Sequence, residues 1–300
     1  MSRTKTIISG ASGWLGKVLI SELISGGHSP YDLKLISSHS KTIDTNNFKL
    51  KSETFETASN LIDADIYFDF AFLTRDKIME IGANKFVEIN KEIIQKSVDL
   101  IASTNPRAIV LSSSGAIYKK GLNDHKDLNH LYSELKIYQE EKISEVCSKI
   151  GANLVICRIF NLSGNGMGNS GTYILSELIE KSLQNLDISI ESSFKVYRRY
   201  CDISQLIRLL ITLGELQKDL ILDTGGELIE IRELAKLVIE CLGSSSKLRF
   251  SEVLDDKSSD FYFSESNQYE QLLKNLTKQD SLTIKEQIYN TKTFIDTNKY

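Results

Sequence analysis

Hydrophobic positions along the chain fall into two patterns, short apolar runs and longer stretches with helical spacing. Between the runs, apolar residues recur every three or four positions, which predicts amphipathic helices; the two longest cover residues 84–103 and 132–149. Alternating strands and helices predict an α/β fold, a doubly wound parallel sheet of the Rossmann kind. The short apolar runs, which predict buried strands, are residues 5–9, 33–36, 66–72, 108–111 and 154–159.

The pattern becomes less regular after about residue 164. Three further helices are predicted there, at 173–183, 203–213 and 231–242, separated by short strands and loops. We therefore expect a first domain over residues 1–163, to which a later segment at about 196–225 returns. Residues 164–300 are expected to form mainly a second, smaller α/β region. A weaker strand near 48–50 and a helical stretch at 56–61 are also predicted.

Composition excludes several classes of protein. Hydrophobic residues make up 41% of the chain and charged residues 25%, as in ordinary globular proteins. The 36 basic and 40 acidic residues leave a net charge of −4, which argues against a nucleic-acid partner. No apolar run approaches the roughly 18 residues of a membrane span, and the N-terminus lacks a signal-peptide pattern, so a cytoplasmic protein without a membrane partner is expected. The four cysteines and four histidines lack metal-site spacing, so no metal is expected.

A glycine-rich turn follows the first predicted strand. Residues 10–16 read Gly-Ala-Ser-Gly-Trp-Leu-Gly, a G-x-x-G-x-x-G pattern between a strand and a helix. Gly10 permits a tight turn, Gly13 lets the backbone approach a pyrophosphate, and Gly16 allows close helix–strand packing. Amide groups at the helix N-terminus would then hold the phosphates. This placement predicts a dinucleotide-binding site.

The end of the second predicted strand bears on which dinucleotide binds. An acidic residue about 20 positions after the glycines would bind the ribose 2′-hydroxyl of NAD. Ser37 stands there, 21 positions after Gly16, and Ser38 follows it. Because no carboxylate would repel a 2′-phosphate, the sequence favours NADP(H), with NAD(H) as the alternative.

Candidate chemistry comes from a tyrosine–lysine pair and a run of serines. Tyr132 and Lys136 lie four positions apart in a predicted helix, so both face the same side. A nearby ammonium favours the ionised phenol, which would let Tyr132 transfer a proton near neutral pH. Residues 112–114 are three serines at the carboxyl end of a buried strand, where parallel sheets bind their ligands. One of these hydroxyls could bind an oxygen that changes between carbonyl and alcohol.

Taken together, these motifs resemble the extended short-chain dehydrogenases/reductases, in particular the NAD-dependent epimerase/dehydratase family, which acts on nucleotide sugars. Further matches are the strand ending at 69–72, Asn90, the Arg-Ile-Phe-Asn-Leu-Ser-Gly segment at 158–164, the Arg-Arg-Tyr-Cys-Asp-Ile segment at 198–203, and the strand and glycine turn at 222–226. The resemblance covers nearly the whole chain. It implies that residues 1–163 bind NAD(P) and that residues 164–300 mainly bind substrate.

The resemblance also implies individual roles. Tyr132 would be the general acid/base, Lys136 would bind the nicotinamide ribose, and Ser114 would hold the substrate oxygen. The implied substrate contacts are Thr74, Ser114, Tyr132, Asn161 and Arg198, of which Asn161 and Arg198 would hold the nucleotide diphosphate. The implied cofactor contacts are Gly10, Ser12, Gly13, Trp14, Leu15, Gly16, Ser37, Ser38, Ala71, Phe72, Asn90, Ser112, Tyr132, Lys136 and Phe160.

Departures from the family pattern leave the substrate open. Gly115 and Ala116 follow Ser114 where a dehydratase often has an acidic residue, and Asp69 stands where the family usually has histidine. The resulting hypothesis is a reductase of a keto nucleotide sugar, most simply a 4-keto sugar. Its alternatives are a nucleotide-sugar C4-epimerase with retained NAD and a non-catalytic nucleotide-binding protein on the same fold.

The two longest predicted helices also suggest a partner. They carry more apolar positions than one sheet face needs to cover, and members of the family commonly pair these helices across a two-fold axis. A homodimer with a four-helix interface is therefore expected.

Overall fold

The computed structural model describes residues 4–45, 48–60, 63–118, 128–167, 173–251 and 259–297. The chain forms two compact units. The first comprises Met1–Ile159 and Ile207–Leu222, and the second comprises Phe160–Leu206 and Asp223–Tyr300. Each unit is described by itself.

A six-stranded sheet forms the centre of the first unit. Its order is β11-β7-β6-β5-β1-β2, and the strand pairs from β7 to β2 are all parallel. The order reverses between β1 and β5, so the carboxyl ends of these two strands lie at a switch point, where such sheets bind ligands. The predicted doubly wound α/β fold is confirmed. The strands are β1 (Thr6–Ser9), β2 (Leu33–Ile36), β5 (Ile66–Asp69), β6 (Ala108–Ser114), β7 (Asn153–Ile159) and β11 (Leu220–Asp223).

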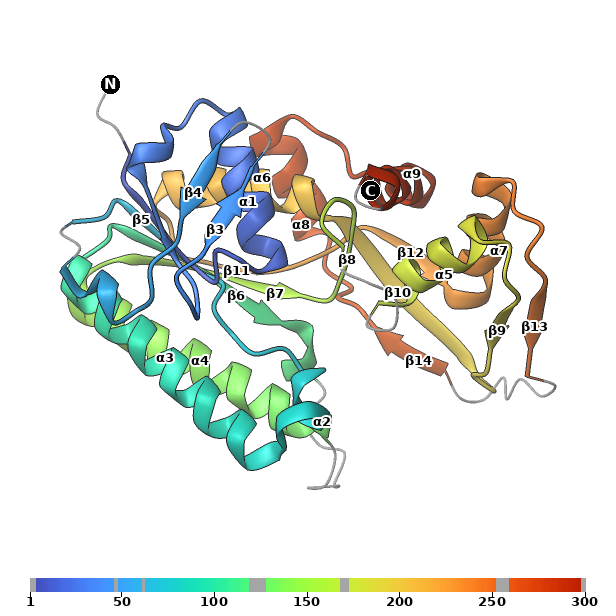
Figure 1. The fold of residues 1–300 in the computed structure, drawn as a ribbon, viewed down its shortest axis with the longest axis horizontal. Coiled ribbons are helices and arrows are strands. Elements are labelled where there is room, and N and C mark those ends of the chain that lie inside the picture. Colours follow the sequence, from blue (N-terminus) through green and yellow to red (C-terminus); the bar gives the residue numbers. More distant parts are fainter. Residues whose placement is uncertain are drawn as a thin grey trace. The chain divides into compact units, whose positions relative to one another are not determined.

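Helices cover both faces of this sheet. The helices α3 (Ala83–Thr104) and α4 (Leu128–Ile150) lie side by side on one face, and α1 (Trp14–Ser25) lies on the other (Figure 1). The helix α6 (Ile203–Leu216) reaches the sheet at Gly214, which faces Ile66 and Val110. Tyr67, Ile109 and Leu111 point the opposite way, into a core shared with α3 and α4. A short helix, α2 (Lys77–Ile81), precedes α3, and one-turn 3-10 helices occupy Pro30–Asp32 and Gly115–Tyr118.

Several predicted elements differ in detail. The strand predicted at 66–72 stops at Asp69, whereas the strand predicted at 108–111 continues to Ser114. The stretch predicted as helical at 56–61 forms a 3-10 helix at Thr57–Asn60, and residues 61 and 62 lie outside the described part. The predicted strand near 48–50 becomes β4 (Lys49–Lys51), which pairs with β3 (Thr42–Asp44) as an antiparallel hairpin rather than joining the parallel sheet.

A four-stranded sheet organises the second unit. Its longest strand, β10 (Lys195–Asp202), runs parallel to β8 (Asn161–Ser163) and β14 (Ser259–Tyr262) and antiparallel to β12 (Glu227–Glu230). The strands β9 (Ile188–Ile190) and β13 (Leu248–Phe250) form a separate parallel pair. The helices are α5 (Ile174–Leu183), α7 (Ile231–Leu242), α8 (Gln268–Leu272), a π-helical turn (Leu273–Thr277) and α9 (Ile284–Thr297).

The segment that returns to the first unit is shorter than expected. It covers Ile207–Leu222 rather than about 196–225. The reason is that β10 makes its strand pairs with β8, β12 and β14, all of the second unit, so it cannot belong to the first sheet.

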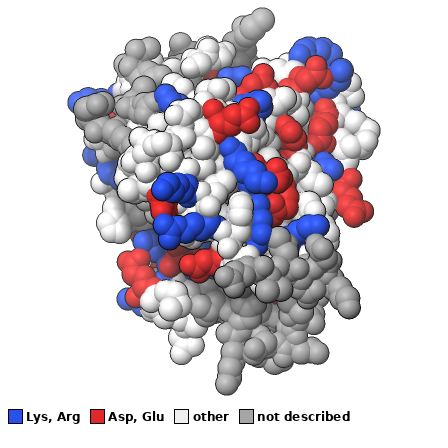
Figure 2. Space-filling view, turned by 90° about the vertical axis from the view of Figure 1, so that its right-hand side faces the viewer, with Lys and Arg blue, Asp and Glu red and all other residues white. Residues whose placement is uncertain are grey.

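Charged side chains of both signs are interspersed on the face shown in Figure 2, in keeping with a net charge of −4. Within the described ranges, no helix combines the length and apolar character needed to cross a bilayer. The same ranges contain no group of three or more His, Cys, Asp or Glu side chains placed to hold a metal ion.

Candidate active site

The glycine turn packs against the end of β5. Gly10 has a φ of 68°, and a Cβ built on it would lie 2.5 Å from the carbonyl carbon of Phe70. A Cβ on Gly16 would lie 2.4 Å from the Gly10 carbonyl oxygen. Both positions therefore require glycine, because backbone rather than a movable side chain occupies the space.

The start of α1 leaves amide groups for a ligand. Gly13 is the N-cap residue; no side chain caps the helix there, and its first turn carries no acidic residue. The amide of Gly13 donates to the Gly10 carbonyl at 2.9 Å, while Ser12, Trp14 and Leu15 around it are only half-buried. Uncapped amides at a helix start, with the positive end of its dipole, suit a phosphate group. This end of the site fits a pyrophosphate.

Ser37 lies directly after β2, beside the glycine turn, since the amide of Ala11 donates to the Ile36 carbonyl at 3.0 Å. The Ser37 side chain is 3% exposed, and its hydroxyl has no hydrogen-bond partner among the described residues. A buried hydroxyl without a partner is rare, and a ribose hydroxyl or phosphate oxygen would satisfy it. Ser38, by contrast, is exposed.

The Lys136 ammonium is buried at the carboxyl edge of the sheet. The side chain is 4% exposed, and Nζ donates to the Ser112 carbonyl at 2.9 Å and to Gln139 Oε1 at 3.0 Å. It also lies 3.8 Å from the centre of the Phe72 ring. Burial lowers the pKa of Lys136 to about 7, and the negative charges of Asp69 and Glu140 act against that decrease.

Tyr132 lies one helical turn before Lys136 and is half-buried. Its ring meets the Phe72 ring edge-on, with centroids 5.7 Å apart and planes at 89°. Phe72 thus contacts both members of the tyrosine–lysine pair. The segment that carries Ala71 and Phe72 is held by Asn90, whose Oδ1 accepts a hydrogen bond from the Leu73 amide at 2.8 Å.

The three serines are the last residues of β6, at its carboxyl end, and all three are buried. The Ser112 hydroxyl donates to the Asp69 carbonyl at 3.2 Å, and Ser114 Oγ accepts from the Ala116 amide at 3.2 Å. The Ser133 hydroxyl donates to the Ala116 carbonyl at 2.9 Å, which fastens α4 to the strand end. The structure therefore brings the ends of β5 and β6 against the turn of α4 that carries Tyr132 and Lys136.

One buried ion pair at this edge was missed from the sequence. Arg158, at the end of β7, donates to both carboxylate oxygens of Glu140, at 3.1 and 2.8 Å, and this pairing raises the pKa of Arg158. Ser113 donates to the same carboxylate at 2.5 Å, and Arg158 also donates to the Tyr118 hydroxyl at 2.7 Å. A signal was present, because Glu140 continues the four-residue spacing of Tyr132 and Lys136 along one helix face.

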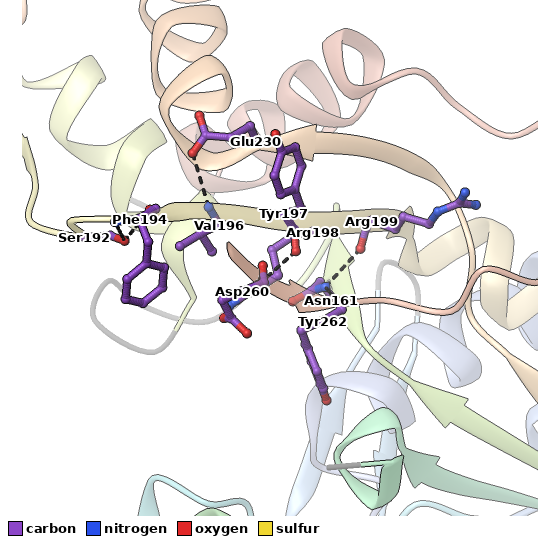
Figure 3. A network of polar contacts seen from close by, with 10 residues as sticks. All are labelled: Asn161, Ser192, Phe194, Val196, Tyr197, Arg198, Arg199, Glu230, Asp260 and Tyr262. Carbon is purple, nitrogen blue, oxygen red and sulfur yellow. Dashed lines mark hydrogen bonds and ion pairs between the residues drawn. The ribbon is translucent and has the colours of Figure 1, made fainter. Parts of the chain in front are cut away.

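The second unit contains two of the implied substrate contacts, Asn161 and Arg198 (Figure 3). The Asn161 amide donates to the Arg199 carbonyl at 3.0 Å and to the Tyr262 carbonyl at 3.4 Å. Arg198 donates to the Tyr197 carbonyl at 2.8 Å and pairs with Asp260 at 2.5 Å. Asn161 thus joins β8 to β10 and β14, and Arg198 joins β10 to β14.

The remaining two implied contacts lie in different units. Phe160, in the second unit, packs its ring 5.0 Å from that of Tyr262, and its amide donates to Thr224 Oγ1 at 3.0 Å. Thr74, in the first unit, is exposed in the loop after β5.

The sequence and the fold of this chain were compared with those of known proteins. Residues 6–220 match the model of the NAD dependent epimerase/dehydratase family. No curated protein matches the sequence.

Solved structures share the fold at low sequence identity. One is a UDP-N-acetylglucosamine 4-epimerase from Methanobrevibacter ruminantium M1 in complex with UDP-N-acetylmuramic acid (TM-score 0.79, 16% identity, covering 99% of each chain). Another is a UDP-glucose 4-epimerase from Thermotoga maritima with UDP-glucose (TM-score 0.77, 13% identity, covering 98% of this chain and 99% of that one). A third is MoeE5 in complex with UDP-glucose and NAD (TM-score 0.74, 15% identity, covering 99% of this chain and 100% of that one).

Proposed function

Because the chain belongs to the NAD-dependent epimerase/dehydratase family, we propose that it reduces a keto group, at C4, of a nucleotide-diphosphate sugar with a nicotinamide cofactor. The observation that carries the proposal is the buried Lys136 ammonium, held at a strand end one helical turn from Tyr132. Such a charge has no packing advantage over a hydrocarbon side chain, which points to a role in chemistry. The related folds solved with UDP-sugars support the class of substrate.

The residues present fit a dinucleotide. The amides of the first turn of α1 would hold the pyrophosphate, and the unpartnered Ser37 hydroxyl would meet the adenosine ribose or its phosphate. Lys136 has three N–H donors, of which two have acceptors within the described part of the chain, so the third suits a ribose hydroxyl. When bound, the nicotinamide supplies hydride to the sugar carbon.

The chain's own residues manage the proton. Tyr132 would hold a proton on its phenol oxygen and deliver it to the substrate oxygen, and the Lys136 ammonium would stabilise the phenolate that remains. Ser114 would donate a hydrogen bond to the same substrate oxygen, which strengthens as that oxygen gains negative charge. Phe72, in contact with Tyr132 and Lys136, would keep water away from the pair.

The cofactor decides between this proposal and a second candidate. A serine in place of an acidic residue at position 37 favours NADPH, which binds and leaves in each turnover. The 4-epimerases among the related folds favour instead a C4-epimerase that retains NAD.

Two measurements test the choice. Mass spectrometry of the ligand released from purified protein shows whether NAD is retained, and a panel of 4-keto nucleotide sugars is assayed with NADPH by the nicotinamide absorbance. Retained NAD without turnover of any keto sugar would replace the reductase by the epimerase.

A homodimer completes the proposal. Ile89 and Ile93 on α3 and Tyr138 on α4 remain partly exposed in the single chain. Burial of apolar helix faces against a second copy would form a four-helix interface. Light scattering at micromolar concentration is expected to give twice the 33.8 kDa chain mass, and a monomer mass would contradict the dimer.

A further inference from the structure

Asp69 is a fully buried carboxylate in the middle of the first unit. It ends the central strand β5, is 0% exposed, and faces α3 and α4 rather than solvent. Burial of a carboxylate is costly unless donors surround it. No step of the proposed reaction uses Asp69 directly, so its charge needs another explanation.

Three donors from three different elements converge on this carboxylate. Ser9 of β1 donates to Oδ1 at 2.6 Å, and Ser97 of α3 donates to the same oxygen at 3.0 Å. The Gln139 amide of α4 donates to Oδ2 at 3.3 Å. Ser9 in turn accepts from the Ala71 amide at 3.3 Å, so its hydroxyl hydrogen is directed to Asp69. Burial raises the pKa of Asp69, and the hydrogen bonds from these three donors, together with the charge of Lys136, act against that increase and favour the ionised carboxylate.

Gln139 connects Asp69 to the reacting lysine. A carboxylate only accepts hydrogen bonds, so Asp69 fixes the amide of Gln139 with its nitrogen toward Oδ2. That orientation turns Oε1 toward Lys136, whose Nζ donates to it at 3.0 Å. The amide thereby orients the ammonium, and the carboxylate beyond it supplies a compensating charge.

We propose that Asp69 is a positioning residue that acts through Gln139 to hold the Lys136 side chain and keep it positively charged. The role rests on the proposed function only in that Lys136 is there assigned to the cofactor ribose and to Tyr132. Ser9 is the last residue of β1 and directly precedes Gly10 of the glycine turn. Because Ser9 and Gln139 both donate to Asp69, the carboxylate also links the end of β1 to α4, the helix that carries Lys136.

Other charges near Lys136 are accounted for. On α4, Glu140 follows one turn later and is paired with Arg158 of β7. On β5, burial raises the pKa of Tyr67, so this phenol stays neutral. On β1 and α3, the groups that face the site are the uncharged Ser9, Ser97 and Asn90. Among the described residues Asp69 is therefore the negative charge near Lys136 that lacks a cationic partner of its own.

The decisive experiment measures the titration of Lys136 directly. The ¹³Cε resonance of Lys136, assigned by its loss in Lys136→Met, is followed with pH in protein labelled at lysine. In Asp69→Asn we expect its midpoint to decrease by about one pH unit or more, because a unit charge several ångströms away in a partly polar interior is removed. An unchanged midpoint would overturn the proposal.

Cofactor affinity provides a second measurement. NADPH is titrated into wild type and Asp69→Asn from about pH 5.5 to 9, a range that spans both expected Lys136 midpoints, and the two proteins are compared at each pH because titration of the cofactor phosphate is common to both. Binding to the wild type should weaken as Lys136 loses its proton, and in Asp69→Asn this weakening should begin at lower pH. Affinities that fall in parallel for both proteins would contradict the proposal.

Two further variants keep the test interpretable. Gln139→Met keeps the Asp69 charge but removes the amide link, so NADPH should bind several-fold more weakly across the whole pH range; wild-type affinity would show that the link is not used. Asp202→Asn is the matched control, because Asp202 is 3% exposed and caps α6 through the Ser204 and Gln205 amides in the second unit. It should lower the melting temperature without moving the Lys136 midpoint.

The outcomes separate the two proposals. A shifted Lys136 midpoint with no turnover of any keto sugar would retain the role of Asp69 and remove the proposed reaction. Turnover that depends on Tyr132, together with a Lys136 midpoint that is the same in wild type and Asp69→Asn, would retain the proposed reaction and remove the role of Asp69. If Asp69→Asn does not fold, Gln139→Met decides the link alone.

Discussion

The polar side chains described above have different hydrogen-bond partners in the two units of this molecule. In the first unit, Gln139 of α4 links the Asp69 carboxylate of β5 to the Lys136 ammonium of α4. Ser9 of β1 and Ser97 of α3 donate further hydrogen bonds to Asp69. In the second unit, Asn161 and Arg198 bond mainly to backbone carbonyls of β10 and β14.

This difference indicates which polar side chains are good evidence for a reactive site. Buried charges such as Asp69 and Lys136, which are linked through other side chains, carry a free-energy cost that strand pairing does not explain, and they point to reactivity. Polar side chains that bond to backbone have a sufficient structural reason to be there. The four changes below test whether this division holds.

The largest effect is expected from Tyr132→Phe, which removes one oxygen and keeps the ring against Phe72. Turnover of the keto sugar should fall by about 10²–10⁴-fold, the usual contribution of a positioned general acid. NADPH affinity should stay near that of the wild type, since Lys136 and the glycine turn are intact. Near-full activity in an absorbance assay would exclude Tyr132 as the proton donor.

Gly226→Ala measures how far the second unit depends on a close approach between two backbone segments. Gly226 has a φ of 103°, and a Cβ there would lie 1.9 Å from the Tyr200 carbonyl oxygen. The free energy of unfolding should decrease by about 3 kcal/mol or more. Gly243→Ala is the control, because Gly243 is also left-handed, with a φ of 59°, but has no atom within 4 Å of a Cβ. Equal losses of the two variants in urea unfolding would mean that the close approach costs nothing.

A substrate-binding role for Arg198 would contradict the division between the two units. If this arginine binds the substrate diphosphate, Arg198→Ala should weaken binding of uridine diphosphate about tenfold or more, and Asp260→Asn, which removes its carboxylate partner, should tighten it. Arg199→Ala is the matched control, because successive residues of a strand face opposite sides of the sheet. Calorimetric titration of the three variants measures the difference. A lower melting temperature in Arg198→Ala with unchanged binding would leave the arginine a purely structural role.

The smallest effect is expected from Ser37→Asp. A carboxylate at the end of β2 would repel a 2′-phosphate and accept hydrogen bonds from an unmodified ribose. The ratio of NADPH to NADH affinity should fall by roughly tenfold and change in favour of NADH, as measured by fluorescence titration. Ser38→Asp, at the exposed neighbouring position, is the control and should change the ratio less. A wild type that binds NADH at least as tightly as NADPH would contradict the assignment of Ser37.

Much of the first unit could be predicted because its signals are local. The strand at 33–36 was predicted at its observed bounds, and the glycine turn lies between the expected strand and helix. In the second unit, the helix at 231–242 was also predicted at its observed bounds, because its apolar spacing is just as local a signal. The pairs β10–β14 and β9–β13 could not be predicted, because each joins segments about 60 residues apart and because β9, β13 and β14 are only three or four residues long, too short for a periodic signal. The helix at 284–297 was missed although Ile284, Ile288 and Ile295 mark its buried face.

Within the candidate site, the same rule separates what was found from what was missed. Tyr132 and Lys136 are four positions apart in one helix, a spacing that can be recognised in the sequence alone. The partners of Asp69 come from β1, α3 and α4, and only the folded sheet shows that Ser9 and Asp69 are register neighbours. Asp69 was noticed as a departure from the family pattern, but its connection to Lys136 depends on the rotamer of Gln139.

The return of Ile207–Leu222 to the first unit limits how the chain can be cut. A fragment that ends at Ile159 lacks β11, the strand beside β7. The donors and acceptors along that side of β7 would then be exposed as an open edge, a template for pairing with other chains. It also lacks the part of α6 whose Gly214 lies against Ile66 and Val110, and uncovers apolar side chains there. A soluble cofactor-binding fragment should therefore need residues 207–222 joined to 1–159 by a short linker, as in a designed internal deletion.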